Sequence, residues 1–135
     1  MATYTGASGV DILTGDSADD FLYGLAGDDS LYGLGGADLL DGGTGADTIV
    51  GGTGDDLFVY GHGDDADTVT DFTAGSATDD VIDLSGVASA TVFQDVLDAA
   101  TDDGTDTTID FGSGDTIALL GVVESELHAD DFSFA

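Results

Sequence analysis

Six aspartates recur at nine-residue intervals in the first half of the chain, and their type and spacing could do chemistry. They are Asp11, Asp20, Asp29, Asp38, Asp47 and Asp56. With no Lys or Arg anywhere in the chain, these carboxylates offer oxygen donors and no built-in counter-charge. Ca²⁺ takes six to eight oxygen ligands, whereas Mg²⁺ prefers to keep its waters and is the weaker candidate. The pattern therefore indicates binding of a hard divalent cation.

The aspartates belong to a nine-residue repeat that runs without a gap from Gly6 to Val59. Its six blocks read GASGVDILT, GDSADDFLY, GLAGDDSLY, GLGGADLLD, GGTGADTIV and GGTGDDLFV. Position one is always Gly, position six is always Asp, and position eight is always apolar; position four is Gly except at Ala18. A fixed period of this kind is typical of a solenoid, in which each block is one structural unit stacked on its neighbours.

Each block predicts a six-residue turn followed by a three-residue strand. Glycine at positions one, two and four allows positive φ and close backbone approach. In the strand, the middle side chain points inward and its neighbours point outward. Two blocks make one coil, so alternate blocks stack as parallel strands about 4.8 Å apart. The inward columns are then Leu13, Leu31 and Ile49 on one side, and Tyr4, Leu22, Leu40 and Phe58 on the other.

The blocks GGTGADTIV and GGTGDDLFV fit the pattern GGxGxDxUx throughout, and the chain resembles the RTX nonapeptide-repeat proteins. The resemblance implies an all-β fold, a right-handed parallel β-roll (β-solenoid) over residues 1–60, with calcium between the turns of alternate blocks. It implies about four Ca²⁺ ions, joining Asp11 with Asp29, Asp20 with Asp38, Asp29 with Asp47, and Asp38 with Asp56. Turn carbonyls complete each site, from Gly6, Gly9, Gly15, Gly24, Gly27, Gly33, Gly36, Gly42, Gly43, Gly45, Gly51, Gly52 and Gly54.

The nine-residue period is lost after Tyr60. The next turn, GHGDD, places Asp65 in register with the repeated aspartates and Asp67 where an apolar residue is expected, so a fifth ion site is a possible reading there. The residues that follow predict strands over Thr68–Phe72 and Asp80–Leu84. They also predict a short amphipathic helix over Thr91–Ala100 and a hairpin of Thr107–Phe111 with Thr116–Leu120.

This second half, residues 61–135, is similar to the segment that follows RTX repeats in exported bacterial proteins. The matching stretches are DTVTDF, DDVIDLSG, TTIDFGSGDTIALLGV and ADDFSF. The resemblance implies a β-rich capping region with one short helix, and an uncleaved C-terminal signal read by type I secretion machinery. Capping also has a physical reason, because the end of a solenoid exposes unpaired strand edges.

Composition excludes several other classes of function. The chain of 135 residues has 29 Asp and Glu and a formal net charge of −29, so it would repel nucleic acid and anionic lipid. It lacks the lysine of a P-loop, and the absence of cysteine excludes thiol chemistry and Cys-ligated zinc. No apolar run is long enough for a membrane span. Neither HExxH nor GxSxG occurs, and His62 and His128 are best interpreted as isolated surface residues.

We therefore expect a non-enzymatic, extracellular calcium-binding protein that folds after export. Stacked carboxylates would repel one another without calcium, and the thin core could not offset chain entropy. The sequence allows a structural role in a surface layer, filament or matrix, with self-association through the N-terminal coil. The alternative is a C-terminal calcium-binding and secretion module of a larger secreted enzyme or adhesin. A simple calcium buffer, or an acidic surface adapted to high salt, also remains open.

Overall fold

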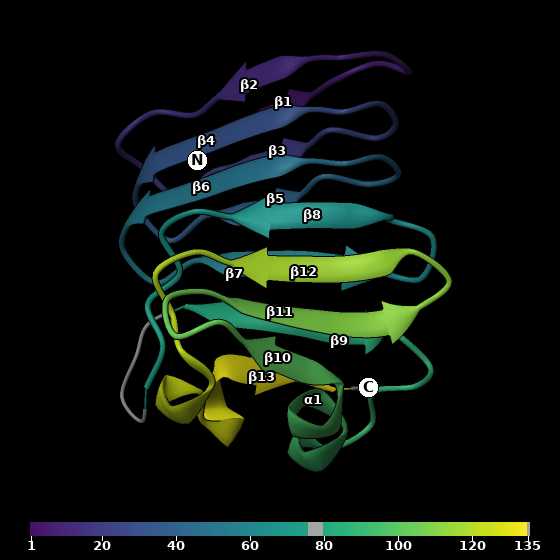
Figure 1. Cartoon of the computed structure of the whole chain (residues 1–135). Helices are drawn as coiled ribbons and strands as arrows, with labels where there is room; N and C mark the ends of the chain where they lie inside the picture. Colours follow the sequence, from purple (N-terminus) through teal and green to yellow (C-terminus); the bar gives the residue numbers. More distant parts are fainter. Residues whose placement is uncertain (76–79, 135) are drawn as a thin grey trace.

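Each nine-residue block contributes one strand, and successive strands alternate between two facing sheets (Figure 1). A computed structural model describes residues 1–75 and 80–134 of the chain. The six-stranded sheet has the order β1-β3-β5-β7-β9-β13, and the seven-stranded sheet has the order β10-β11-β12-β8-β6-β4-β2. The predicted all-β parallel β-roll is confirmed.

The strand bounds show how short the repeated unit is. The six-stranded sheet contains β1 (Thr3–Thr5), β3 (Phe21–Tyr23), β5 (Leu39–Asp41), β7 (Leu57–Gly61), β9 (Val81–Gly86) and β13 (Phe132–Ser133). The seven-stranded sheet contains β2 (Ile12–Thr14), β4 (Ser30–Gly35), β6 (Thr48–Thr53), β8 (Ala66–Val69), β10 (Ala100–Asp102), β11 (Thr107–Gly112) and β12 (Asp115–Leu119).

Strands two blocks apart pair in parallel and in the predicted register. Leu13 lies opposite Leu31, and Leu22 lies opposite Leu40. Leu22, Leu31 and Leu40 are fully buried between the sheets, whereas Leu13 at the N-terminal end is only partly buried. A single layer of inward side chains between the two sheets therefore forms the core of the roll, as the period-two alternation within each strand requires.

The two sheets continue past residue 60 without a break. Strand β8 pairs in parallel with β6, and β9 pairs in parallel with β7. Strands β12, β11 and β10 then extend the seven-stranded sheet, with antiparallel pairing between β12 and β11 and between β11 and β10. Both sheets therefore cross the predicted boundary between residues 60 and 61. The division of the chain into a roll and a capping region there stays a prediction from the sequence.

The helical segments lie at the C-terminal end of the roll (Figure 1). They are α1 (Phe93–Ala99) and two 3-10 turns, η1 (Glu124–Glu126) and η2 (Ala129–Asp131). The helix and the β11–β12 hairpin were expected from the sequence; β10 was not, and it begins directly where α1 ends. None of the helices in the described part of the chain has the length and apolar character that crossing a membrane requires.

Two local differences from the sequence prediction have physical reasons. Strand β8 ends at Val69 rather than continuing to Phe72, because Asp71 turns back and accepts hydrogen bonds from the N–H groups of Gly51 and Gly52. Leu25 and Leu34 occupy position two of their blocks with φ of 82° and 79°, a conformation expected there only for glycine. Their side chains are half exposed.

The column of inward side chains predicts that truncating an inward residue lowers the free energy of unfolding far more than truncating an outward residue does. Leu31→Ala would remove a fully buried side chain and lower the free energy of unfolding by about 2–5 kcal/mol. Ile12→Ala, at an outward position that is 74% exposed, is the control and would change it by less than about 0.5 kcal/mol. Urea unfolding of both variants in one buffer measures the difference, and equal losses would contradict the single-layer core.

Candidate metal centre

The repeated aspartates form two ladders that run along the roll. In each rung, the backbone N–H of one aspartate donates to Oδ1 of the aspartate one coil later. The Asp11 N–H donates to Asp29 and the Asp29 N–H to Asp47, each at 2.7 Å. On the other side the Asp20 N–H donates to Asp38 at 2.7 Å. The offset is 18 residues in each case, so the side chains that carry the charge also set the register.

Each ladder extends one coil beyond the nonapeptide repeat. The Asp47 N–H donates to Asp67 Oδ1 at 3.0 Å, and the Asp56 N–H donates to Asp80 Oδ1 at 3.1 Å. The ladders are therefore Asp11, Asp29, Asp47 and Asp67 on one side, and Asp20, Asp38, Asp56 and Asp80 on the other. The structure brings all six sequence-predicted aspartates into the ladders and adds Asp67 and Asp80, which the sequence analysis did not place there.

The prediction that Asp65 stands in register was wrong. Asp65 has φ of 64° in the turn, and its carbonyl accepts a hydrogen bond from the Tyr60 hydroxyl. The turn is two residues longer than in the repeat, so Asp67 takes the ladder position and Val69 takes the apolar one. A signal was present in the sequence: Asp67-Thr68-Val69 repeats the Asp-x-apolar triplet of Asp47-Thr48-Ile49, at a spacing of 20 rather than 18.

Three buried carboxylate oxygens on the ladders have no hydrogen-bond partner among the residues that the structure describes. They are Oδ2 of Asp29, Asp38 and Asp47, on side chains that are at most 2% exposed. An isolated ionised carboxylate is very costly to bury, and such groups in proteins are paired or coordinate metals. With no Lys or Arg in the chain, a positive charge for these oxygens must come from outside.

The glycine at position one of each block leaves room where oxygen atoms converge. A Cβ on Gly6 would lie 2.7 Å from the Gly24 carbonyl oxygen and 2.8 Å from Asp11 Oδ2. A Cβ on Gly15 would lie 2.7 Å from the Gly33 carbonyl oxygen and 2.8 Å from Asp20 Oδ2. The position-one glycines, which are Gly6, Gly15, Gly24, Gly33, Gly42 and Gly51, have no left-handed φ, so this close approach is what requires them.

The glycines at positions two and four lie in the turns and have a different role. Gly27, Gly36, Gly43, Gly45, Gly52 and Gly54 all have positive φ. A Cβ on Gly27 would lie 2.7 Å from the Gly9 carbonyl oxygen, so these turns stack backbone on backbone. Gly9 itself, in the first turn, has open space around it. These turn glycines are therefore required by left-handed backbone and by close stacking of turn on turn.

The donor set fits a cation that takes oxygen ligands. Within residues 1–75 and 80–134, no three acidic or histidine side chains gather in a group that could hold a metal ion. Instead, a carboxylate and a carbonyl from the next coil converge at each position-one glycine, as Asp11 Oδ2 and the Gly24 oxygen do beside Gly6. This mixture of carboxylate and carbonyl oxygen suits Ca²⁺, which accepts flexible geometry and high coordination number, better than it suits Mg²⁺.

Burial raises the pKa of the interior ladder carboxyls. It raises the pKa of Asp47 and of Asp56 to about 6, and the charges of other aspartates, among them Asp29 and Asp38, add to the shift. At the outer end, the N–H groups of Asp16 and Ala2 hold the pKa of Asp20 below its usual value. The interior of the ladder therefore resists ionisation more than its N-terminal end does.

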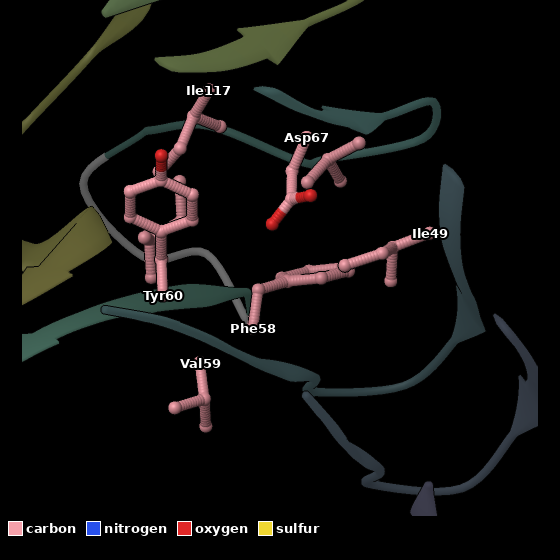
Figure 2. A pocket seen from close by; sticks show the side chains of 8 residues that line it. Ile49, Phe58, Val59, Tyr60, Asp67 and Ile117 are labelled. Atoms are coloured by element: carbon pink, nitrogen blue, oxygen red, sulfur yellow. The ribbon is translucent and has the colours of Figure 1, made fainter. Parts of the chain in front are cut away.

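Asp67 is the most strongly shifted of these carboxyls. Figure 2 shows its carboxylate among Ile49, Phe58, Tyr60 and Ile117, beside a cavity of about 10 Å³. This volume is at the lower limit for one water molecule, so little solvation is available. Burial raises the pKa of Asp67 to about 8. Ile117 lies opposite Asp67 in the next strand, so an apolar residue ends this ladder.

The two histidines take no part in the ladders. His62 Nδ1 lies 2.5 Å from Asp115 Oδ2, and the imidazole is 72% exposed. The Gly63 N–H donates to the same carboxylate. The His128 N–H donates to Asp131, and its side chain is exposed. His62 is therefore paired on the surface rather than isolated as expected.

The fold and the stacked oxygen donors define a calcium-binding β-roll of RTX repeats. Residues 5–40 match the RTX calcium-binding nonapeptide repeat in four copies. Residues 37–135 match the C-terminal region of the serralysin peptidases of family M10. The chain therefore belongs to the serralysin C-terminal family, preceded by and overlapping with RTX repeats. Both are non-catalytic modules of proteins associated with type I secretion. A search of curated proteins found no match.

Solved structures share this architecture over nearly the whole chain. The extracellular lipase LipA from Serratia marcescens is 27% identical with a TM-score of 0.81; the match covers 98% of this chain and 21% of the lipase. The AlgE6R3 subunit of the Azotobacter vinelandii mannuronan C5-epimerase is 30% identical with a TM-score of 0.70, covering 96% and 81%. The AlgE6R2 subunit is 27% identical with a TM-score of 0.60, covering 96% and 93%. The chain thus spans about a fifth of the lipase's length.

The raised pKa values predict opposite effects of pH with and without a divalent cation. In excess chelator, protonation favours the folded state, because the folded pKa of Asp67, Asp47 and Asp56 exceeds the unfolded value of 3.8. Their contribution to stability is full below about pH 4 and is lost as pH rises through 6 to 8. With calcium present, protons compete for the same oxygens, so the apparent calcium affinity falls from pH 8 to pH 5.

Circular dichroism at pH 8 and pH 5, in chelator and in calcium titrations, measures both trends. Asp67→Asn mimics the protonated side chain and should reduce the pH dependence in chelator between pH 6 and 8. A metal-free chain that gains β signal as pH rises would contradict the assignment.

Proposed function

We propose that this chain is a calcium-gated folding module of an exported bacterial protein. The observation that carries the proposal is the set of buried, unpartnered Oδ2 atoms on Asp29, Asp38 and Asp47, each on a ladder that has carbonyl oxygens alongside. A divalent cation between coils neutralises these charges and occupies the space that the position-one glycines leave open. The family match to calcium-binding repeats supports the same cation.

The ions would lie between consecutive coils of each ladder. The pairs expected from the repeat are Asp11 with Asp29, Asp20 with Asp38, Asp29 with Asp47, and Asp38 with Asp56. The ladder extensions add Asp47 with Asp67 and Asp56 with Asp80 as two further candidate pairs. Asp71 supports the second of these from the side, because its carboxylate holds the N–H groups of Gly51 and Gly52 in the turn.

Calcium binding would be coupled to folding because the thin apolar core alone cannot offset the repulsion between the carboxylates. The core is a single layer, and the chain carries a net charge of −29 with no internal cation other than its N-terminus and histidines. Without an ion, the ladder places like charges about 4.8 Å apart. When an ion binds only the folded coils, its binding free energy becomes folding free energy.

This coupling gives the module a role in export. In a cytosol with little free calcium, the chain would stay unfolded and able to pass through type I secretion machinery. Outside, calcium above a Kd of roughly 10⁻⁴ to 10⁻³ M, the range of extracellular modules, would fold it. The similar lipase is extracellular, and the match covers a fifth of it. We therefore propose an extracellular carrier module, without activity of its own, for a larger secreted protein.

A structural, self-assembling role is the second candidate. The observation that favours it is the N-terminal end of the roll, where β1 and β2 are the outermost strands of their sheets. Sedimentation velocity with and without calcium tests this role on its own. A concentration-dependent oligomer that forms only in calcium is the expected result for an assembling protein, and a monomer at all concentrations counts against that role.

Replacing one interior carboxylate tests the folding mechanism. Asp38→Asn keeps an oxygen that accepts the Asp20 N–H but removes the charge that the ion needs. We expect the calcium concentration at half-maximal β signal to rise by about tenfold, because ligand charge tunes affinity. Asp55→Asn changes the charge equally on an exposed side chain beside Asp56 and is the matched control, with less than a twofold change.

Two results of these titrations would refute the proposal. One is a wild-type chain whose circular dichroism and thermal melting are unchanged by excess EDTA. The other is an equal shift for Asp38→Asn and Asp55→Asn, which would indicate general charge screening rather than specific sites.

The close approach of oxygen atoms to the position-one glycines, here called the glycine cradle, can be tested independently with an uncharged substitution. Gly15→Ala would place a methyl group against the Gly33 carbonyl and Asp20 Oδ2, so calcium-dependent stability should fall by about 1–3 kcal/mol. Gly9→Ala keeps the carbonyl and meets no atom within 4 Å, so it should be nearly neutral. Thermal melting in saturating calcium compares the two; similar behaviour would contradict the cradle.

A further inference from the structure

The outward faces of the two sheets differ in chemistry. In each strand the residues on either side of the buried one point away from the core. On the six-stranded sheet, the outward residues that precede the buried column pair from strand to strand and are all apolar and partly exposed. This outer apolar row consists of Phe21, Leu39, Leu57 and Val81. The equivalent residues of β4, β6 and β8 in the other sheet are Ser30, Thr48 and Thr68.

A second outward row lies on the other side of the buried column. It pairs Tyr23 with Asp41, Asp41 with Val59, and Val59 with Asp83. Tyr23 and Val59 widen the apolar surface, and Asp41 places a carboxylate between them. The paired strands are about 4.8 Å apart, so the outer apolar row is about 14 Å long. The helical segments lie at the C-terminal end of the roll, away from β3 and β5 (Figure 1).

A groove of about 410 Å³ adjoins this surface where the strands lead into their turns. Its walls include the apolar side chains of Tyr23, Leu25 and Val59 and the carboxylates of Asp41 and Asp64. Leu25 is 51% exposed, so much of this apolar wall is open to solvent. The groove therefore joins apolar contact area to two acidic groups at one edge of the sheet.

The two carboxylates in the groove lack a cationic side chain of their own. Asp64 Oδ2 accepts the Gly61 N–H at 2.5 Å. Burial raises the pKa of Asp64, and the nearby charge of Asp41 adds to the rise. His62, in the same turn, pairs with Asp115 instead, and the chain has no Lys or Arg. A lysine or arginine that pairs with these carboxylates must come from another molecule.

From these observations we propose that the outward face of the six-stranded sheet is a docking surface for a basic amphipathic segment of another polypeptide. Apolar side chains of that segment cover the outer apolar row. A Lys or Arg beside them enters the groove and makes charge-assisted hydrogen bonds with Asp41 and Asp64. An α-helix rises 1.5 Å per residue, so about ten residues match the length of the row.

A second copy of the chain fits this surface less well than a basic partner does. Each copy carries a net charge of −29 and would bring no lysine or arginine to the groove. A symmetric contact through this face would place Asp41 and Asp64 of both copies in one desolvated interface, and the two net charges would repel each other. Charge complementarity therefore favours a partner of opposite sign.

Binding of a model peptide tests the proposal on the full chain in saturating calcium. The probe is a fluorescent helical peptide of leucine and lysine, about 14 residues long, with its leucines on one face. Fluorescence anisotropy in about 0.15 M salt measures the Kd, because this ionic strength screens long-range attraction to the net charge. The same peptide with glutamine in place of lysine should bind about tenfold more weakly.

The apolar row is tested by giving it the chemistry of the other sheet. The double variant Leu39→Thr and Leu57→Thr keeps β-branched residues in the strands but removes apolar contact area, so the Kd should rise by about tenfold or more. Val50→Thr makes the same kind of change at a partly exposed outward position of β6 and is the control. It should change the Kd by less than about twofold.

The groove is tested by removing two charges without changing side-chain size. Asp41→Asn with Asp64→Asn should raise the Kd of the lysine peptide by about tenfold, because two charge-assisted hydrogen bonds are lost. Asp19→Asn with Asp55→Asn removes the same charge from exposed positions. These two residues precede β3 and β7, at the opposite edge from the groove, so this control should bind the peptide almost normally.

Chemical shifts of the unmodified chain provide an arm that does not depend on the folding of any variant. On addition of the peptide, the amide signals of β3, β5 and β7 should shift more than those of β4 and β6. Shifts spread equally over both sheets would overturn the proposal, and so would equal effects of the groove variant and its charge-matched control. Equal binding of the glutamine peptide would exclude a basic partner. A concentration-dependent dimer that Leu57→Thr disrupts would overturn the proposal in favour of a second copy.

Discussion

Repulsion between buried carboxylates is the constraint on which the rest of this structure depends. A parallel roll places chemically identical positions one above another at the spacing of paired strands, so an acid in one block becomes a column of acids. Backbone N–H groups satisfy one oxygen of each rung, but the second oxygens of Asp29, Asp38 and Asp47 stay unpartnered. A chain without lysine or arginine has no internal solution to this problem.

The local chemistry of each block follows from the same constraint. The position-one glycine is small because a carbonyl and a carboxylate approach the same point, while the glycines at positions two and four accept left-handed turns. The core can remain one layer thick because the hydrogen bonds from backbone N–H groups to the ladder carboxylates add to the packing of Leu22, Leu31 and Leu40. Toward the second half, the apolar surroundings of Asp67 make ionisation more costly, and Ile117 ends the column.

The roll could be predicted from the sequence because the nine-residue period, the strand register and the column of inward side chains can all be read from it. Position eight of each block predicted the buried residues. Position six predicted the ladders, because aspartates 18 residues apart lie in consecutive coils. The extensions through Asp67 and Asp80 were missed because they follow the preceding aspartate of their ladder by 20 and 24 residues rather than 18, and counting from a fixed period hides an insertion. The Asp-x-apolar triplet survives there and would have found them.

Other features depend on tertiary contact and could not be predicted locally. Asp71 leaves the strand to hold a turn from the preceding coil, and β10 forms because β11 is beside it. Leu25 and Leu34 take a glycine-like conformation and lie against Gly43 and Gly52 in the next coil, which have the same positive φ. In each case a distant segment decides the conformation, and neither propensity nor periodicity contains that information.

The uneven spacing of the last rungs has a consequence for how such a molecule can change over time. The offset grows from 18 to 20 and 24 residues while the aspartates keep their hydrogen bonds. In the turn before Asp67, the two extra residues therefore lie outside the column. A segment inserted in such a turn, for example an epitope or a recognition loop, could be gained or lost without disturbing the aspartate ladder. This makes the turn a natural site for diversification and for grafting.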